Sequence, residues 1–186
     1  AILRWSLDND RVETALRLLA ETFMAWFRMG HWREGERWHQ EALALAGDAK
    51  TSWVCEGLTH LGTFIAVQGR YAEVDPLREK ARRMVEDIDN IRATVIFAVQ
   101  SIPAERELND ARKWFEKLIS ILTDWDHPLR DSQVSAAYGL MADRLRDEGY
   151  FDQARELYLK AIKFDKEHRG FMSPYMPGNL GRLELQ

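Results

Sequence analysis

The sequence predicts an all-α protein in which helix hairpins stack into a solenoid, and three observations predict it. Apolar residues recur every three or four positions, as in Val12–Phe27 and Ala154–Ile162, the spacing that gives a helix one apolar face. Turn-forming residues divide the chain into roughly nine or ten segments of helical length. Four segments align with one another at a period of roughly 40 residues, which is the signature of a repeat architecture.

The composition limits the class of protein. The chain has 186 residues, of which 46% are hydrophobic and 30% charged, enough for a sizeable core. Its longest run without a charged residue, Gly57–Gly69, has 13 residues, whereas a membrane-spanning helix needs about 20. A net charge of -4 disfavours nucleic acid and anionic membranes as partners. The first residues lack the pattern of a secretory signal, so we expect a cytoplasmic protein without direct nucleic-acid or membrane contact.

The first predicted unit covers residues 10–47. Asp10, with Glu13 three residues later, resembles a capping box, so we expect Asp10 to cap the first helix. Gly30 separates that helix from the second one. Gly35 lies inside the second helix, where glycine costs about 1 kcal/mol relative to alanine, so we expect a close approach of another helix there.

The second unit, 49–88, turns at Gly69, and the third covers 90–125. The segment Thr94–Val99 is β-branched and by itself suits a strand. We interpret it as helix, because a single strand would have nothing to pair with. Pro103 is expected to end the third unit's first helix early.

The fourth unit, 129–169, turns at Gly149. Asn179–Gly181 match the first helix of a further unit, so a partial fifth unit is predicted over 174–186. We therefore expect one continuous array over residues 1–186, about four and a half repeats long and cut from a longer protein.

Small and aromatic residues alternate at the positions where neighbouring helices should meet. The small ones are expected to allow close approach; they are Gly62, Ala81, Ala142, Ala154 and Ala161. The rings are expected to fill the gaps between successive pairs; they are Tyr71, Phe151 and Tyr158. Most of the seven Trp residues are likewise expected in the core.

The pattern resembles the tetratricopeptide repeat, in which paired helices carry leucine–glycine–aromatic and alanine–aromatic–alanine signatures. The resemblance is carried by Leu61, Gly62, Ile65, Gly69, Tyr71, Arg78 and Ala81, and by Met141, Ala142, Leu145, Gly149, Phe151, Ala154, Tyr158 and Ala161. It implies a right-handed α-α superhelix. The sequence departs from the family pattern at Gly35, His39 and Arg106.

The period is longer than the 34 residues of the standard repeat and resembles that of the C-terminal repeats of bacterial STAND-type signal-transduction ATPases and LuxR-like transcriptional regulators. Ala15–Leu18, Trp26 and Gly30–Trp38 carry this likeness. It implies a non-catalytic protein–protein interaction or regulatory scaffold module of a larger cytosolic regulator. The alternative is a small-molecule effector-sensing domain that controls an attached ATPase.

In tetratricopeptide arrays the first helix of each pair lines a concave groove. The resemblance places nine residues there: Met24, Phe27, Arg28, His60, Thr63, Phe97, Gln100, Asp143 and Arg146. Apolar and charged side chains side by side suit recognition of a protein or peptide partner, or of an adjacent domain of the same chain. The alternative interpretation places Phe27 and Phe97 in the core.

Catalytic and metal-binding patterns are weak in this sequence. The five histidines show no pair at the tight spacing that zinc sites use. Acidic pairs such as Glu34 with Glu36 fall at turns and on solvated faces, and there is no phosphate loop or nucleophile elbow. We therefore expect no enzymatic activity, no cofactor and no metal.

Overall fold

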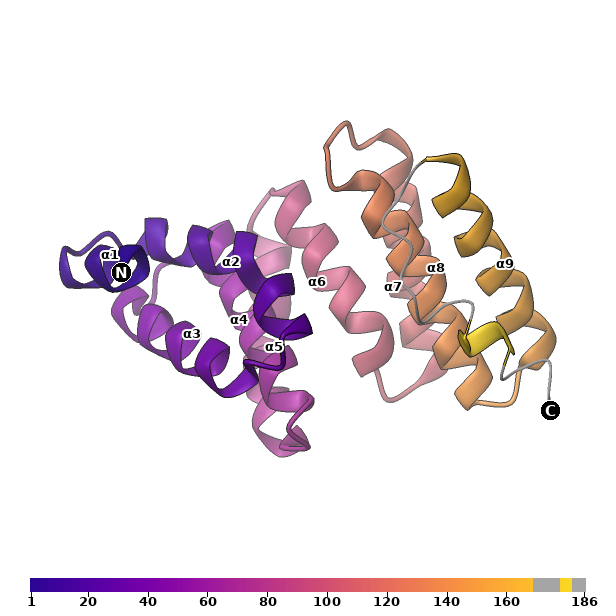
Figure 1. Cartoon of the computed structure of the whole chain (residues 1–186), viewed down its shortest axis with the longest axis horizontal. Helices are drawn as coiled ribbons and strands as arrows, with labels where there is room; N and C mark the ends of the chain where they lie inside the picture. Colours follow the sequence, from indigo (N-terminus) through magenta and orange to yellow (C-terminus); the bar gives the residue numbers. More distant parts are fainter. Residues whose placement is uncertain (169–177, 182–186) are drawn as a thin grey trace. The chain divides into compact units, whose positions relative to one another are not determined.

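The computed structural model describes residues 1–168 and 178–181, and its regular structure is helical throughout that part (Figure 1). The all-α prediction is confirmed, with Thr94–Val99 inside a helix. The helices are α1 (Ile2–Asp8), α2 (Val12–Arg28), α3 (Trp32–Ala46), α4 (Ser52–Ala66), α5 (Tyr71–Asp87), α6 (Ile91–Ala104), α7 (Leu108–Asp124), α8 (Arg130–Asp147) and α9 (Phe151–Glu167). None of these helices is long and apolar enough to cross a bilayer.

The chain divides into two compact units, residues 1–97 and 98–186, and the boundary falls inside α6. In the first unit α2 packs on α3 and α4 on α5, while α4 also contacts α2 and α3. In the second unit α8 packs on both α7 and α9. The first, second and fourth predicted hairpins therefore form, and the unit boundary lies within the predicted third one.

Side-chain contacts within each unit repeat at about the sequence period. In the described part of the chain, seven pairs of polar groups lie 34 to 41 residues apart. The pairs are Arg4–Glu41, Lys50–Asp87, Arg70–Glu36 and Arg92–Glu56 in the first unit, and Arg112–Gln153, Arg144 with the carbonyl of Arg106, and Asn179–Asp143 in the second. Arg70–Glu36, Arg92–Glu56 and Arg112–Gln153 thus join successive repeats, as a repeat architecture requires, whereas Lys50–Asp87 joins the two ends of one hairpin.

Three of the predicted turns share one backbone conformation. Gly30, Gly69 and Gly149 have φ of 73°, 79° and 83°, a region that residues with a side chain rarely adopt. The amide after each glycine donates to the carbonyl five residues before it, at 3.0, 3.3 and 2.8 Å. This is the Schellman arrangement that ends a helix, and it explains why glycine recurs at these positions.

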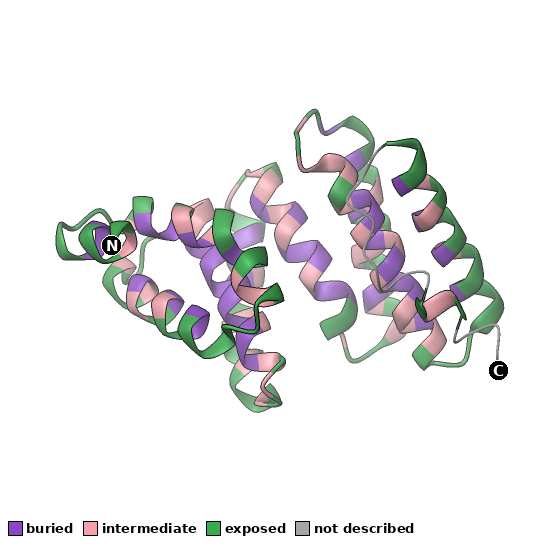
Figure 2. Ribbon diagram, viewed as in Figure 1, coloured by how far each residue is buried: buried purple, intermediate pink, exposed green. Residues whose placement is uncertain are grey.

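The expected small residues lie in the cores. Ala81 in the first unit and Ala142, Ala154 and Ala161 in the second are fully buried, and Tyr158 of α9 has no exposed surface. Figure 2 shows the alternation along α9, where buried positions interrupt an exposed outer face. The four alanines and Tyr158 therefore occupy the inter-helix positions that the repeat predicts.

Other aromatic residues do not fill the core as predicted. Tyr71 is 70% exposed and Phe151 45% exposed, because each is the first residue of its helix and lies beyond the hairpin contact. Of the seven Trp residues only Trp125 is buried. Most of the aromatic excess therefore lies at partly exposed positions.

Three predictions about single residues and one about the last unit can be compared with the structure. A Cβ on Gly35 would lie 2.6 Å from the Phe64 ring, so the predicted close approach is confirmed. The helix α6 ends one residue after Pro103, also as predicted. The capping box at Asp10 is wrong, because the cap of α2 is Arg11 without a side-chain bond. Of the predicted fifth unit, residues 178–181 are helical, and 174–177 and 182–186 lie outside the described residues.

Candidate interaction site

The structure gives the nine predicted groove residues three different environments. Met24 and Arg28 are exposed on α2. His60 and Phe97 are buried, at 3% and 2% exposure, so neither side chain is available to a partner. The remaining five are partly exposed: Phe27, Thr63, Gln100, Asp143 and Arg146.

His60 is a packing residue of the first unit. Its ring stacks on Phe23 at 4.0 Å and meets His39 edge-on at 6.0 Å. Burial lowers the pKa of His60 well below its ordinary value, and it lowers the pKa of His39 to about 4 despite a 2.7 Å hydrogen bond with the Gly35 carbonyl. Both rings are therefore neutral, and the position predicted for the groove instead joins successive first helices.

Asp143 and Arg146 do lie together, but they are engaged within the second unit. Arg146 donates to Asp143 at 3.0 Å, Asn179 donates to the same carboxylate oxygen at 2.8 Å, and the Tyr158 hydroxyl donates to it as well. Burial and this bond raise the pKa of Tyr158. The pair joins α8 to α9 and to the helical residues 178–181, so it stabilises the fold.

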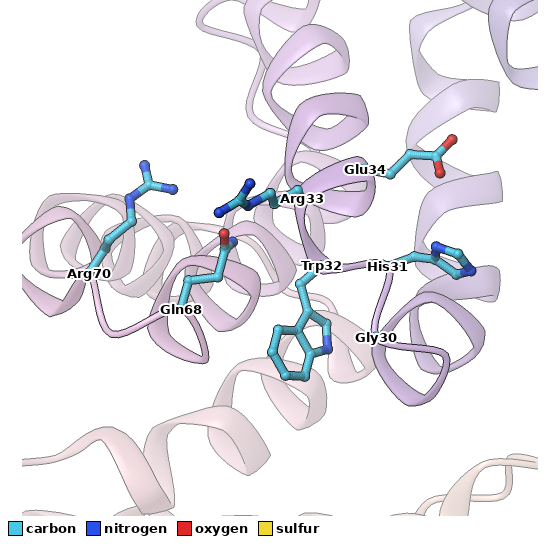
Figure 3. Close-up of a pocket in the computed structure, with 7 residues that line it drawn as sticks. All are labelled: Gly30, His31, Trp32, Arg33, Glu34, Gln68 and Arg70. Carbon is cyan, nitrogen blue, oxygen red and sulfur yellow. The ribbon is translucent and has the colours of Figure 1, made fainter.

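A pocket that the sequence analysis missed lies in the first unit, where the turns of its two hairpins come together. Its volume is about 570 Å³, and it is lined by Gly30, His31, Trp32, Arg33, Glu34, Gln68 and Arg70 (Figure 3). These residues belong to turns and to the first turn of α3. From the sequence, these segments indicate only where helices end and begin. The repeat offered one signal, since Gly30 and Gly69 occupy equivalent positions.

We call this pocket the turn-edge pocket. Glu36 holds two of its lining residues, Gln68 and Arg70, in place. The carboxylate is buried and accepts bonds from Arg70 at 2.8 and 2.9 Å, from Gln68 at 2.7 Å and from Gln40 at 3.1 Å. Arg70 also donates to Glu73 at 2.7 and 2.6 Å. The bonds to Glu73 and Glu36 raise the pKa of Arg70, which is therefore a fixed cation.

The polar ends of three pocket residues face the same space. Figure 3 shows Arg33, Gln68 and Arg70 directed toward one another, the Trp32 ring beside them, and His31 and Glu34 directed to the other side. Trp32 is held by a 2.9 Å bond from its Nε1 to the carbonyl of Phe27. This arrangement places the guanidinium of Arg33 next to an aromatic face, while the donors of Gln68 and Arg70 are engaged by Glu36, Glu73 and the Phe64 carbonyl.

Exposed apolar side chains adjoin the pocket in the sequence. Met29 precedes Gly30, Val67 precedes Gln68 and Tyr71 follows Arg70; all three side chains are exposed. An aromatic and apolar rim beside arginine is typical of the energetic centre of protein interfaces. We call Met29, Val67 and Tyr71 the apolar rim.

No group of His, Cys, Asp and Glu side chains that could hold a metal ion occurs in residues 1–168 or 178–181. No protein-family model matches the chain, and no curated protein sequence matches it. The site therefore has to be interpreted from its own chemistry.

Proposed function

We propose that the chain is a non-catalytic protein-interaction or scaffold module of a larger cytoplasmic regulator. The supporting observation is a group of exposed apolar and basic side chains of the first unit, on the second half of α2 and around the turn-edge pocket. The group presents Met24, Arg28, Met29, Trp32 and Arg33 to solvent. Large apolar side chains, a tryptophan and arginines are the residue types that contribute most to binding at protein interfaces.

The framework beneath this surface is rigid enough for recognition. Trp32 is hydrogen-bonded to α2, and Glu36 joins α3 to Gln68 and Arg70. A surface held in one conformation loses less entropy when a partner binds. These hydrogen bonds therefore favour binding of a partner at this surface with little change in its conformation.

The larger context is proposed from the resemblance. Contacts 34 to 41 residues apart support tetratricopeptide-like repeats of the longer kind, which resemble those of STAND-type ATPases and LuxR-like transcriptional regulators. An upstream G-x-x-x-x-G-K-[ST] loop in the full-length chain would support an attached ATPase. A full-length chain without any nucleotide-binding motif would contradict this part of the proposal.

Binding of selected peptides tests the interaction function. Twelve-residue peptides selected by display against the intact chain are titrated against wild type, Met24→Glu and Leu159→Glu. Both substitutions place a charge at an exposed apolar residue, and Leu159 lies on α9 in the other unit. We expect Met24→Glu to weaken binding by about tenfold or more while Leu159→Glu does not. Failure to select any peptide, or binding indifferent to Met24→Glu, would contradict the proposal.

The effector-sensing alternative is favoured by the size of the pocket. A volume of about 570 Å³ lies within the usual range for small-molecule sites. A ligand would raise the free energy of unfolding by RT ln(1 + [L]/Kd). A thermal-shift screen of small organic acids that moves the melting temperature of wild type, but not of Arg33→Glu, would favour this function over partner binding.

A further inference from the structure

The two arginines of the turn-edge pocket differ in whether their hydrogen-bond donors are already engaged. Arg70 donates through Nε and both terminal nitrogens to Glu36 and Glu73. Arg33 has no hydrogen bond and no ion pair within residues 1–168 and 178–181. Arg33 is therefore the cation of this pocket whose donors are available.

The nearby carboxylates leave room for an acidic group at Arg33. Both oxygens of Glu36 are covered by Arg70, and that side chain is buried. Glu34 is directed to the opposite side of α3 (Figure 3). An arginine fork matches a carboxylate with two parallel hydrogen bonds, so a carboxylate is the complement of this pocket.

The apolar rim indicates that the carboxylate belongs to a peptide and not to a free acid. Met29 is 73% exposed and Tyr71 70% exposed, and each is one residue from the pocket lining. A small acid in the pocket would leave both side chains in water. A peptide segment carries apolar side chains within a few ångströms of its acidic ones and can cover both.

We propose that the turn-edge pocket binds a segment of a partner protein in which a Glu or Asp pairs with Arg33 and large apolar side chains on either side of it pack on Met29 and on Tyr71. This inference rests on the proposed interaction function and assigns it a partner chemistry. The site lies at the turns between helices and not at the predicted groove positions.

A designed peptide array tests the chemistry. The intact chain, labelled at its amino terminus, is applied to 12-residue peptides that contain one Glu and a Trp or Leu on either side of it, at separations of one to four residues. Matched peptides carry Gln or Lys in place of Glu. We expect the Glu peptides to bind best, and the Kd of the strongest binder is then measured by fluorescence anisotropy.

Variants locate the contact. Arg33→Glu is expected to weaken the Glu peptide at least tenfold and to bind the Lys peptide better than wild type does, because the charges are exchanged. Lys80→Glu is the matched control, since Lys80 is also exposed and lies ten residues beyond Arg70, about 15 Å along α5. Tyr71→Ala should weaken both the Glu and the Gln peptides. Arg33 and Tyr71 lie on the surface, so a circular-dichroism melt should show that the variants fold.

The outcomes separate this inference from the function on which it rests. Equal binding of Glu and Gln peptides, or an unchanged Kd in Arg33→Glu, would overturn it, even if Met24→Glu abolishes binding and the interaction function stands. Displacement of the peptide by millimolar succinate would reassign the pocket to a free small acid and would overturn it as well. If the display selection yields no binder, the interaction function itself fails.

Discussion

Gly35 shows at the residue scale how one missing side chain lets two helices meet. A Cβ at this position would lie 2.6 Å from Cζ of Phe64, whose ring is fully buried and cannot retreat into solvent. Gly35→Ala gains about 1 kcal/mol of helix propensity but overpacks the core by about 1 to 3 kcal/mol. We expect a net loss of up to about 2 kcal/mol, measured by urea denaturation.

Gly62→Ala is the matched control, because Gly62 is also buried inside a helix. Its Cβ would meet only Val74, at 3.5 Å, which is an ordinary contact. We expect this variant to be neutral or up to about 1 kcal/mol more stable. An equal loss in both variants would show that the Phe64 contact is not the reason for Gly35.

The buried histidines make the stability of the first unit depend on pH. Burial holds the pKa of His39 at about 4 in the folded chain against 6.5 when exposed. Between these values the unfolded chain binds the proton and the folded one does not, so stability is lost as pH falls from about 6.5 toward 4. At about 1.4 kcal/mol per pKa unit, His39 accounts for about 3 kcal/mol, and the pKa of His60 is shifted in the same direction.

Unfolding free energies at several pH values between 5 and 7 check this prediction. His39→Phe is expected to make the pH dependence shallower, whatever it does to stability at pH 7. His31→Gln is the control, because His31 is exposed at the start of α3. A slope unchanged by His39→Phe would show that His39 is not the titrating group.

At the scale of elements, the α8–α9 hairpin depends on small residues where its helices meet. Ala154 has no exposed surface and lies one turn before the buried ring of Tyr158. Ala154→Leu adds three carbons where no space is available and should cost about 1 to 3 kcal/mol. The same exchange at exposed Ala72, in the first turn of α5, should change stability by less than about 0.5 kcal/mol. Equal denaturation midpoints for the two variants would contradict the assignment of Ala154 to the interface.

Helices and turns could be predicted from the sequence because their causes are local. Apolar spacing indicates α2 and α9, and the positive φ at Gly30, Gly69 and Gly149 explains their place in the repeat. The capping box at Asp10 could not be judged in this way. Asp10 itself adopts φ of 56° and the cap moves to Arg11, a choice that depends on how α1 meets α2.

The faces of the helices were harder to predict than the helices themselves. The resemblance assigns His60 and Phe97 to a groove, yet both are buried. Successive residues on a helix point about 100° apart, so a register error of one position exchanges two faces. The stacking of Phe23 on His60 marks the true inner position. The turn-edge pocket was missed for another reason: Arg33 and Arg70 meet only when two hairpins stack, and no single segment contains both.

At the scale of the whole molecule, a destabilising substitution in a repeat protein should lower stability mainly in the helices near it. Contacts such as Arg70–Glu36 and Arg112–Gln153 join residues about one period apart, and the Arg92–Glu21 ion pair joins residues two periods apart within the first unit. Each hairpin is therefore stabilised mainly by itself and its neighbours. Gly35→Ala should therefore lower amide protection most strongly in α2 to α5 of the first unit and least in α8 and α9. Ala154→Leu should do the reverse. Hydrogen exchange followed by mass spectrometry measures both patterns; a uniform loss of protection in either variant would mean that the chain unfolds as one cooperative body, and nearest-neighbour stabilisation would be the wrong description of this fold.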